Sequence, residues 1–437
     1  MSKRLLRGAR VVDPANGRDG AFDVLIEGDR IARVGRDLPI DDETTVVDVP
    51  SGLVVCPGLI DMHVHLREPG QEHKETVATG TAAAVAGGFT SVACMPNTRP
   101  VNDNAGVTEY ILRKAAEANL ARVYPIGAVS RGQQGEQLAD IAELRQAGCV
   151  AITDDGHPVA TAMLMRRALE YAGMFNLPII EHCEEQTLQA DGVAHEGFHA
   201  SALGLRGIPG EAESIMALRD IALAELTRGV VHIAHMSARQ TLDAVRWGKS
   251  RGARVTCEVT PHHFILTDEM LGAPVPYDTN VKMNPPLREA ADRDAMLVGL
   301  ADGSVDVIAT DHAPHHYDEK QVEFDRAPFG ITGLETAVSL CFDRLVHPGV
   351  VSLARLIELL SVNPARILSV KGGALSEGAP ADISILAPDM RVTVDAGRMR
   401  SKSKNTPFDG WTLRGGVAAT IVGGRVVYAN EGVSLQL

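Results

Sequence analysis

The sequence lacks several features that would assign it to common classes of protein. No apolar run reaches the ~18 residues that a membrane-spanning helix needs, and the start MSKRLLRGARVVD turns polar too soon for a secretory signal peptide. Basic residues are too few for a nucleic-acid-binding surface, because 42 of them stand against 56 acidic ones and give a formal net charge of −14. We therefore expect a cytoplasmic protein that binds neither membranes nor nucleic acids.

Cysteine is also scarce. The six cysteines are scattered along the chain without a CxxC motif, and most lie in apolar runs with the composition of strands. We expect them to be small buried residues in a reducing compartment. Apolar residues make up 45% and charged residues 22% of the chain, which is ordinary globular usage and excludes disordered and fibrous classes.

The two ends of the chain are both rich in β-strand patterns, and the middle is not. Residues 1–55 contain two short β-branched runs, and the last 65 residues contain ADISILAP, MRVTVDAG and TIVGGRVVYANEG with a Gly-Gly turn. Neither end has enough strands for a stable sheet of its own. The pattern predicts one small β domain that is assembled from both termini.

The middle of the chain, residues 56–370, alternates short apolar runs with Ala/Leu/Arg/Glu-rich stretches of helical composition. There are eight such runs, at 59–66, 90–96, 122–129, 149–153, 177–180, 230–234, 255–259 and 305–309. Eight strand-then-helix units over about 300 residues are what a (β/α)₈ barrel requires. The rival fold, a doubly wound sheet, would be expected to carry a GxGxxG loop after its first strand, and that motif is absent there.

Polar side chains gather where these runs end. In the first run Asp61, His63, His65 and Arg67 alternate, which predicts that they share one face of a strand. Five of the eight run ends offer a His or Asp suited to a divalent metal, and these residues are His63, His65, Asp154, Asp155, His182, His235, Asp311 and His312. Barrel enzymes place their reacting groups at the carboxyl ends of strands, and six such ligands suit two metals bridged by a shared carboxylate and a hydroxide.

Structural explanations exist for each residue taken singly. A lone histidine at a strand end is often only structural, and TDDG is also a turn sequence. An aspartate such as Asp311 in an apolar strand requires a partner for its charge. We expect Asp61 to orient its neighbours. A role in orienting a metal ligand stays open for His262 and His263. We expect no chemical role for six other histidines, His73, His157, His195, His199, His232 and His347.

Seven motifs along the chain together resemble one family. DMHVHLREPG, MPNT, TDDG, HCEE, TPHH, KMNPPLR and ATDHAPH, followed by APFGI, are similar to the motifs of bacterial dihydroorotases of the amidohydrolase superfamily. The resemblance covers nearly the whole chain. It implies an α/β fold with a distorted (β/α)₈ TIM-like barrel at 56–370 and a small β-sandwich formed from 1–55 and 371–437.

The resemblance also implies roles for residues at matching positions. His63 and His65 would hold one divalent ion, most simply Zn²⁺, with Asp311 close by, while His182 and His235 would hold a second. Asp155 would bridge the two ions, and its 27-residue spacing to His182 favours it over Asp154. CVAITDDG contains no lysine, so the chain is similar to the branch that does not use a carboxylated lysine. Substrate contacts are implied for six residues, Arg67, Asn97, Asn284, His315, Phe329 and Gly330.

The implied reaction is the reversible cyclisation of N-carbamoyl-L-aspartate to L-dihydroorotate and water, a step of pyrimidine biosynthesis. A metal-bridging hydroxide would act with Asp311 as general acid and base. Two alternatives stay open: another cyclic amidohydrolase such as allantoinase or a dihydropyrimidinase, and an inactive or partner-dependent homologue that is a structural subunit with aspartate transcarbamoylase. A homo-oligomer, as a dimer, is also expected.

Overall fold

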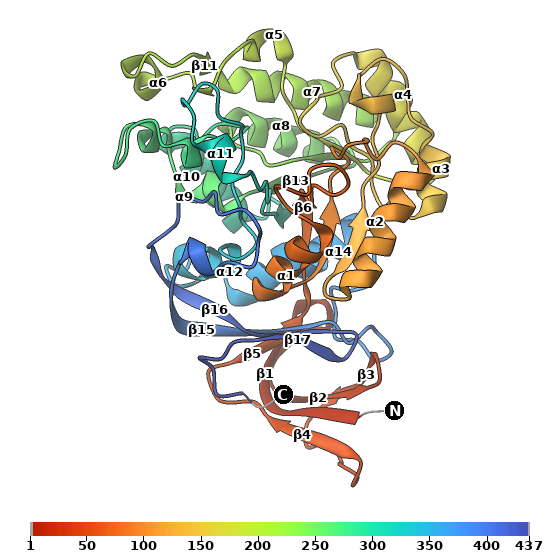
Figure 1. Cartoon of the computed structure of the whole chain (residues 1–437). Coiled ribbons are helices and arrows are strands. Elements are labelled where there is room, and N and C mark those ends of the chain that lie inside the picture. Colours follow the sequence, from red (N-terminus) through yellow and green to blue (C-terminus); the bar gives the residue numbers. More distant parts are fainter. Residues whose placement is uncertain (1–2, 436–437) are drawn as a thin grey trace.

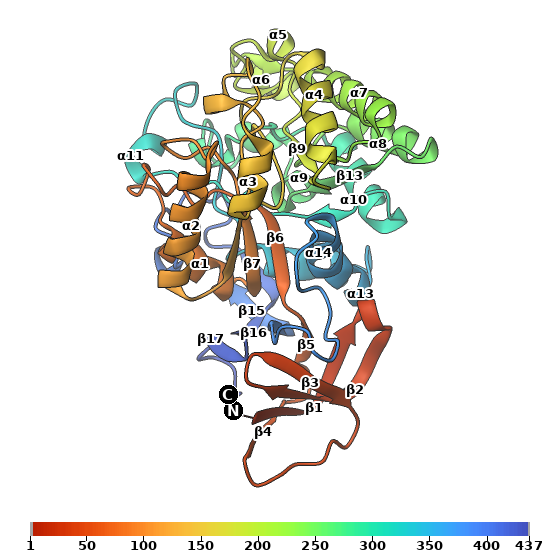
Figure 2. The same ribbon diagram turned by 90° about the vertical axis from the view of Figure 1, so that its right-hand side faces the viewer.

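The computed structural model describes residues 3–435. Strands from both ends of the chain form one eight-stranded sheet in the order β17-β16-β15-β5-β1-β2-β3, with β4 paired to β1. The strands are β1 (Lys3–Asp13), β2 (Arg18–Glu27), β3 (Arg30–Gly35), β4 (Thr44–Asp48), β5 (Val54–Pro57), β15 (Ile383–Thr393), β16 (Thr412–Val422) and β17 (Arg425–Ala429). Figures 1 and 2 show this sheet at one end of the molecule, beneath the helical part.

The two halves of this sheet are joined through β5 and β15. These strands pair antiparallel, with Val55 opposite Ile385, although 330 positions separate them in the sequence. A hydrophobic cluster that draws on both halves, including Leu6, Val24 and Ile421, excludes water from the inner face. Neither half alone closes this core, which is why the chain ends fold together. We propose the division 1–55, 56–370 and 371–437, noting that β5 runs across its first limit.

Seven parallel strands and one bridging segment form the barrel. The strands are β6 (Leu59–Val64), β7 (Phe89–Cys94), β8 (Arg122–Pro125), β9 (Ile179–Glu181), β12 (Val231–Ile233), β13 (Val255–Val259) and β14 (Val307–Ile308). The fourth predicted run contributes only bridges at Ile152, which pairs with Gly127 on one side and Ile179 on the other. A bridge between Val64 and His312 joins the last strand to the first. The ring is therefore closed but irregular.

Helices follow the strands and cover the outside of the ring. The longer ones are α1 (Val77–Ala86), α2 (Ala105–Ala118), α3 (Ile141–Ala147), α4 (Ala162–Gly173), α7 (Gly210–Thr227), α8 (Arg239–Ser250) and α10 (Ala290–Asp302). Short helices and an additional strand pair are α5 (Gln186–Gln189), β10 (Ala194–His195), α6 (Phe198–Ala202), β11 (Gly207–Ile208), α9 (Pro261–Ile265), α11 (Tyr317–Lys320), α12 (Ala337–Cys341), α13 (Leu353–Ile357) and α14 (Asn363–Ile367). Figure 2 shows α4, α7 and α8 side by side on the outside.

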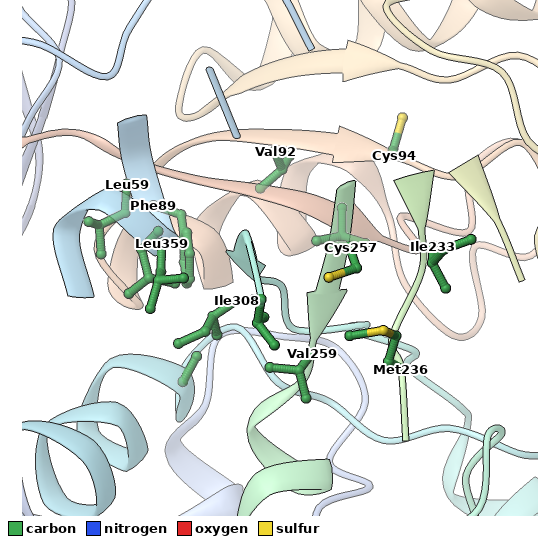
Figure 3. Packing of buried hydrophobic residues seen from close by; sticks show 14 of the residues in the cluster. Leu59, Phe89, Val92, Cys94, Ile233, Met236, Cys257, Val259, Ile308 and Leu359 are labelled. Atoms are coloured by element: carbon green, nitrogen blue, oxygen red, sulfur yellow. The ribbon is translucent and has the colours of Figure 1, made fainter. Parts of the chain in front are cut away.

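Hydrophobic side chains from the barrel strands pack against the helices and form the main core. Figure 3 shows members of this cluster from β6, β7, β12, β13 and β14, with Leu359 from the helical segment Glu358–Val362. All six cysteines are buried and free, as the sequence predicts. Within residues 3–435, no helix combines the length and hydropathy needed to cross a membrane.

Candidate active site

The first barrel strand positions its polar residues differently from the sequence-based expectation. β6 ends at Val64, so Asp61 and His63 lie on the strand while His65 and Arg67 follow it. The backbone N–H of His65 donates to the carbonyl of His312 at 2.8 Å, and Arg67 adopts a left-handed backbone with φ +62°. The prediction that all four residues share one strand face is therefore wrong, although His63, His65 and Arg67 still reach the same region. A left-handed residue turns the chain in a way that alternation cannot reveal.

Four histidines surround one carboxylate. Asp155 Oδ1 lies 3.4 Å from His63 Nε2, 3.5 Å from His235 Nε2 and 3.8 Å from His182 Nδ1. Its other oxygen, Oδ2, lies 3.5 Å from His65 Nε2. One carboxylate thus faces all four imidazoles. His63 and His65 come from the end of β6, whereas His182 follows β9 and His235 follows β12. A carboxylate in this position could share metal ions with the surrounding imidazoles.

Asp311 faces the same cluster from the last strand. Its Oδ1 lies 3.1 Å from His65 Nε2 and 3.6 Å from His63 Nε2. Asp311 is buried and adopts a positive φ of 47°, which aims its side chain into the barrel mouth. Burial acts to raise the pKa of Asp311, but the hydrogen bond from His65 and the nearby His63 hold it below its usual value.

The neighbouring aspartates have structural partners. Asp154 accepts hydrogen bonds from the backbone N–H groups of Val129 and Ser130 and from the Ser130 hydroxyl. Asp61 Oδ1 accepts from the backbone N–H groups of His63, at 3.1 Å, and Thr310, at 3.2 Å. Asp154 is therefore occupied with a loop, whereas Asp61 links the first and last strands. Of the two aspartates in TDDG, only Asp155 faces the histidines.

Two side chains orient the histidines of the first strand. Glu258 on β13 accepts from His63 Nδ1 at 2.6 Å, and Asn97 accepts through Oδ1 from His65 Nδ1 at 2.9 Å. Each bond orients its ring so that Nε2 faces the carboxylates, and it favours the tautomer in which Nε2 would be the atom that binds a metal ion. His232 Nε2 donates to the other oxygen of Glu258 at 3.1 Å, so this histidine has a supporting role that the sequence did not reveal. The two histidines also hold the pKa of Glu258 at about 2, against the effect of its burial.

The donor set fits divalent cations. His63, His65 and Asp311 form one group of ligand atoms that lie within 4.8 Å of one another, and His63, Asp155 and His235 form a second. Asp155 Oδ1 and His63 Nε2 are buried and have no hydrogen-bond partner in the described structure. Buried polar atoms without partners cost free energy unless a ligand satisfies them. Imidazole nitrogens and carboxylate oxygens together suit zinc and similar ions.

A hollow of about 190 Å³ opens above this cluster. Its lining contains all six residues predicted to contact substrate, namely Arg67, Asn97, Asn284, His315, Phe329 and Gly330, together with His65, Asp155, His182, His235 and Asp311. The tertiary structure therefore brings residues from eight separate stretches of the sequence to one small cavity. Only a small molecule fits such a volume.

Arg67 supplies the hollow with a fixed positive charge. Its Nε donates to the Pro314 carbonyl at 3.2 Å, and one terminal nitrogen lies 3.4 Å from His315 Nε2. Burial lowers the pKa of Arg67 to about 10, so the guanidinium stays charged at neutral pH. His315 Nε2 donates to the Phe329 carbonyl at 2.8 Å, which ties this side chain to the far wall of the hollow.

Besides His232, sequence reasoning missed Glu258 and Asn405, which also support the site. Glu258 was visible as a single charge within the apolar run VTCEV, and a buried charge requires a partner. Asn405 lies beyond the barrel, yet its amide accepts from the His315 backbone N–H and donates to the carbonyls of Ala313 and Gly330, each at 3.1 Å. No local pattern marks Asn405, because its partners are about 75 to 92 positions away.

Comparison with solved structures identifies the fold. The fold is similar to L-hydantoinase from Arthrobacter aurescens, with a TM-score of 0.87, 23% identity and coverage of 98% of this chain and 96% of that one. It is also similar to dihydropyrimidinase from Brevibacillus agri, with a TM-score of 0.83, 23% identity and coverage of 98% and 95%. This likeness confirms the predicted fold class, a distorted barrel with a terminal β-sandwich.

Comparison of sequences then defines the family. A family model described as "Dihydro-orotase-like" matches residues 52–241. The curated protein named "Dihydroorotase" from Syntrophotalea carbinolica is 53% identical over 426 residues, covering 98% of this chain and 99% of the relative. Its namesake from Anaeromyxobacter sp. is 54% identical over 423 residues, with 97% of each chain covered. The chain belongs to the dihydroorotase family, which confirms the resemblance drawn from its motifs.

Proposed function

We propose that this chain catalyses the reversible cyclisation of N-carbamoyl-L-aspartate to L-dihydroorotate and water in pyrimidine biosynthesis. The observation that carries the proposal is that, over nearly the whole chain, more than half of the aligned residues are identical to those of proteins named dihydroorotase. The hollow supports it, since a single buried arginine stands beside a cluster of histidines and carboxylates. A small anionic substrate with a carboxylate next to an amide matches this arrangement.

Arg67 binds the substrate carboxylate in this proposal. Its Nε is bound to the Pro314 carbonyl, and the planar guanidinium can recognise a carboxylate through two parallel hydrogen bonds. Asn97, Asn284 and His315 supply polar groups around the same substrate end, and the backbone at Phe329 and Gly330 forms the wall. A local charge at contact distance outweighs the overall charge of −14.

Asp311 transfers the proton. In the biosynthetic direction its carboxylate takes a proton from the ureido nitrogen as the ring closes, and it delivers that proton to the oxygen that leaves as water. In the hydrolytic direction the same carboxylate takes a proton from water and delivers it to the ring nitrogen, as microscopic reversibility requires. The low pKa of Asp311 keeps it ionised and ready to accept a proton at neutral pH.

Two divalent ions complete the proposed site, and we propose zinc for both. His63, His65 and Asp311 would hold one ion, His182 and His235 the other, and Asp155 both. When bound, such ions lower the pKa of water to about 7 and polarise the amide carbonyl. The protein's own contribution is to fix the imidazoles through Glu258 and Asn97 and to bury the ligands.

One experiment tests the substrate. Purified, zinc-loaded protein is assayed with dihydroorotate, allantoin and hydantoin at neutral and slightly alkaline pH. We expect turnover of dihydroorotate alone. Turnover of allantoin or hydantoin instead would favour the alternative cyclic amidohydrolases. No turnover of any of the three compounds would favour an inactive or partner-dependent subunit.

The proposed assembly is a homodimer, with aspartate transcarbamoylase as a candidate partner. Support comes from large apolar side chains that are exposed on one face of α7: Ile215 at 49%, Leu218 at 43% and Leu226 at 62%. Such a stripe on an outer helix is typical of an interface. Sedimentation of the purified chain, alone and with the transcarbamoylase, tests both predictions.

A further inference from the structure

Two lysines are almost completely buried beside the substrate hollow, although the proposed chemistry uses neither. Lys282 is 2% exposed and Lys320 is 4% exposed. Lysine is among the residues least often buried, because its ammonium loses hydration in the interior. Burial lowers the pKa of Lys282 to about 8, and that of Lys320, which also faces Lys282, to about 7. A feature this costly calls for a structural or functional reason.

The lysines hold backbone carbonyl groups of two segments. Lys320 Nζ donates to the carbonyl of Pro328 at 2.7 Å, to that of Thr279 at 3.0 Å and to that of Lys282 at 3.5 Å. Lys282 Nζ donates to the carbonyls of Phe324 at 2.8 Å and Asp325 at 3.0 Å. The recorded acceptors of both ammonium groups are backbone carbonyls, so each lysine joins stretches of chain rather than balancing a charge.

The two joined segments carry three of the residues that line the hollow. Segment 279–284 ends at Asn284, and segment 324–330 ends at Phe329 and Gly330. The Gly330 N–H donates to the Lys282 carbonyl at 2.9 Å, and Lys282 Nζ lies 4.6 Å from the centre of the Phe329 ring. Lys282 thus links its own segment to 324–330 and lies against the Phe329 ring, and Lys320 binds carbonyls of both segments.

We propose that Lys282 and Lys320 are positioning residues for the dihydroorotase reaction. They fix segment 279–284 against segment 324–330, so that Asn284 and the Phe329–Gly330 backbone face the substrate in register. The inference rests on the proposed function for its substrate. Neither lysine contacts the reacting atoms, so their loss is expected to weaken substrate binding far more than the chemical step.

Kinetics of a Lys320→Met variant test the role. Methionine is unbranched and only one heavy atom shorter than lysine, but it donates no hydrogen bond to the three carbonyls. We expect KM for dihydroorotate to rise at least about tenfold while kcat stays within about threefold, with metal content unchanged. The matched control is Lys249→Met. Lys249 donates to the Ser304 carbonyl and to Asp306, both at 2.7 Å. These two residues precede β14, at the end of the barrel opposite the hollow. This control should leave KM unchanged.

Two further measurements separate positioning from general stability. Amide hydrogen exchange should quicken in peptides that contain 324–330 in Lys320→Met but not in Lys249→Met. In Lys320→Ala, n-propylammonium replaces the deleted atoms and should restore KM, whereas tetramethylammonium, which has no N–H donor, should not. Lys282→Met repeats the test should Lys320→Met fail to fold.

Clear outcomes would overturn the inference. A KM equal to that of the wild type, unchanged exchange in 324–330, or equal rescue by both ammonium ions would each count against positioning. An inactive wild-type enzyme would count against the proposed function, whereas an active wild type with an unaffected Lys320→Met variant would count against this inference alone.

Discussion

At the scale of single residues, Asp311 has the most demanding role in the proposed mechanism. Replacing it with asparagine keeps the shape and one oxygen ligand but removes the proton acceptor. We expect Asp311→Asn to retain most of its metal while kcat falls by several orders of magnitude, since general acid–base catalysis alone contributes about 10²–10⁴-fold. Parallel metal analysis and steady-state kinetics check this prediction. Turnover near that of the wild type would show that another group moves the proton.

Arg67 is the second residue with a distinct expected effect. Lysine keeps the positive charge but cannot reproduce the planar fork that meets a carboxylate through two hydrogen bonds. We expect Arg67→Lys to raise KM for dihydroorotate by about tenfold or more, with metal content unaffected. Initial-rate kinetics over a wide substrate range provide the measurement. An unchanged KM would rule out Arg67 as the carboxylate anchor.

Glu258 acts on the site through His63. Glutamine in its place weakens the acceptor for His63 Nδ1 and for His232 Nε2, so the imidazole is less firmly oriented and less basic. Loss of such a partner typically costs 10–100-fold in metal affinity, and we expect a fall of that order in Glu258→Gln. Competition with a chromophoric chelator measures it. Asp382→Asn, which alters a buried carboxylate paired with Arg122, is the control and should keep its metal affinity.

At the scale of elements, the strand ends were the most predictable part of the site. Seven of the eight apolar runs contain barrel strands, because a strand buried on both faces is apolar throughout. The fourth run forms only bridges at Ile152, since its residues turn early toward Asp154 and Asp155. The alternation drawn through Arg67 was wrong because β6 ends at Val64 and Arg67 has a left-handed backbone.

The strand pair β10–β11 provides a test of pH dependence. His195 is buried, its Nδ1 accepts a hydrogen bond from Arg288 at 3.2 Å, and Glu289 and Asp292 also lie near it. Burial and the positive charge of Arg288 lower the pKa of His195 to about 4. As the pH falls from about 6.5 to 4, the unfolded chain takes up a proton that the folded chain does not, so stability is lost over this window.

Replacement of His195 should remove part of this pH dependence. We expect the Tm of His195→Gln to fall less steeply than that of the wild type between pH 6.5 and pH 4, because glutamine accepts the same bond and does not titrate. Thermal unfolding followed by circular dichroism across this range provides the comparison. Parallel curves for the two proteins would mean that other groups account for the acid sensitivity.

At the scale of the whole molecule, the proposed ions couple strands that come from distant parts of the sequence. The proposed ligands at or just after the ends of β6, β9, β12 and β14 meet only in the folded chain, so an ion that binds them would stabilise the folded state. At a free concentration 100 times the Kd, one site contributes about 2.7 kcal/mol. We expect chelator-treated protein to melt several degrees lower and added zinc to restore the Tm. An identical Tm before and after verified metal removal would contradict this.

The sequence by itself determined the class of fold and the kinds of residue at the site. Burial on both faces makes barrel strands apolar, and the repeated His and Asp at their ends stand out against that background. These signals are local patterns of residues, so they can be recognised in a single sequence without a structure. The pairing of both chain ends in one sheet was also predictable, because neither end could bury its own strands.

Only the tertiary structure decided how the site is supported. Glu258 on β13 binds His63 on β6, His232 supports Glu258 from the neighbouring strand, and Asn405 binds His315 from beyond the barrel. Lys282 and Lys320 bind carbonyls of segments that lie nearby in space. Hydrogen bonds of this kind depend on distance and direction between backbone and side-chain atoms, which no periodicity records. The candidate ligands could be recognised from local sequence patterns. The hydrogen bonds that hold them in place depend on contacts between distant parts of the chain, which form only when the whole chain folds.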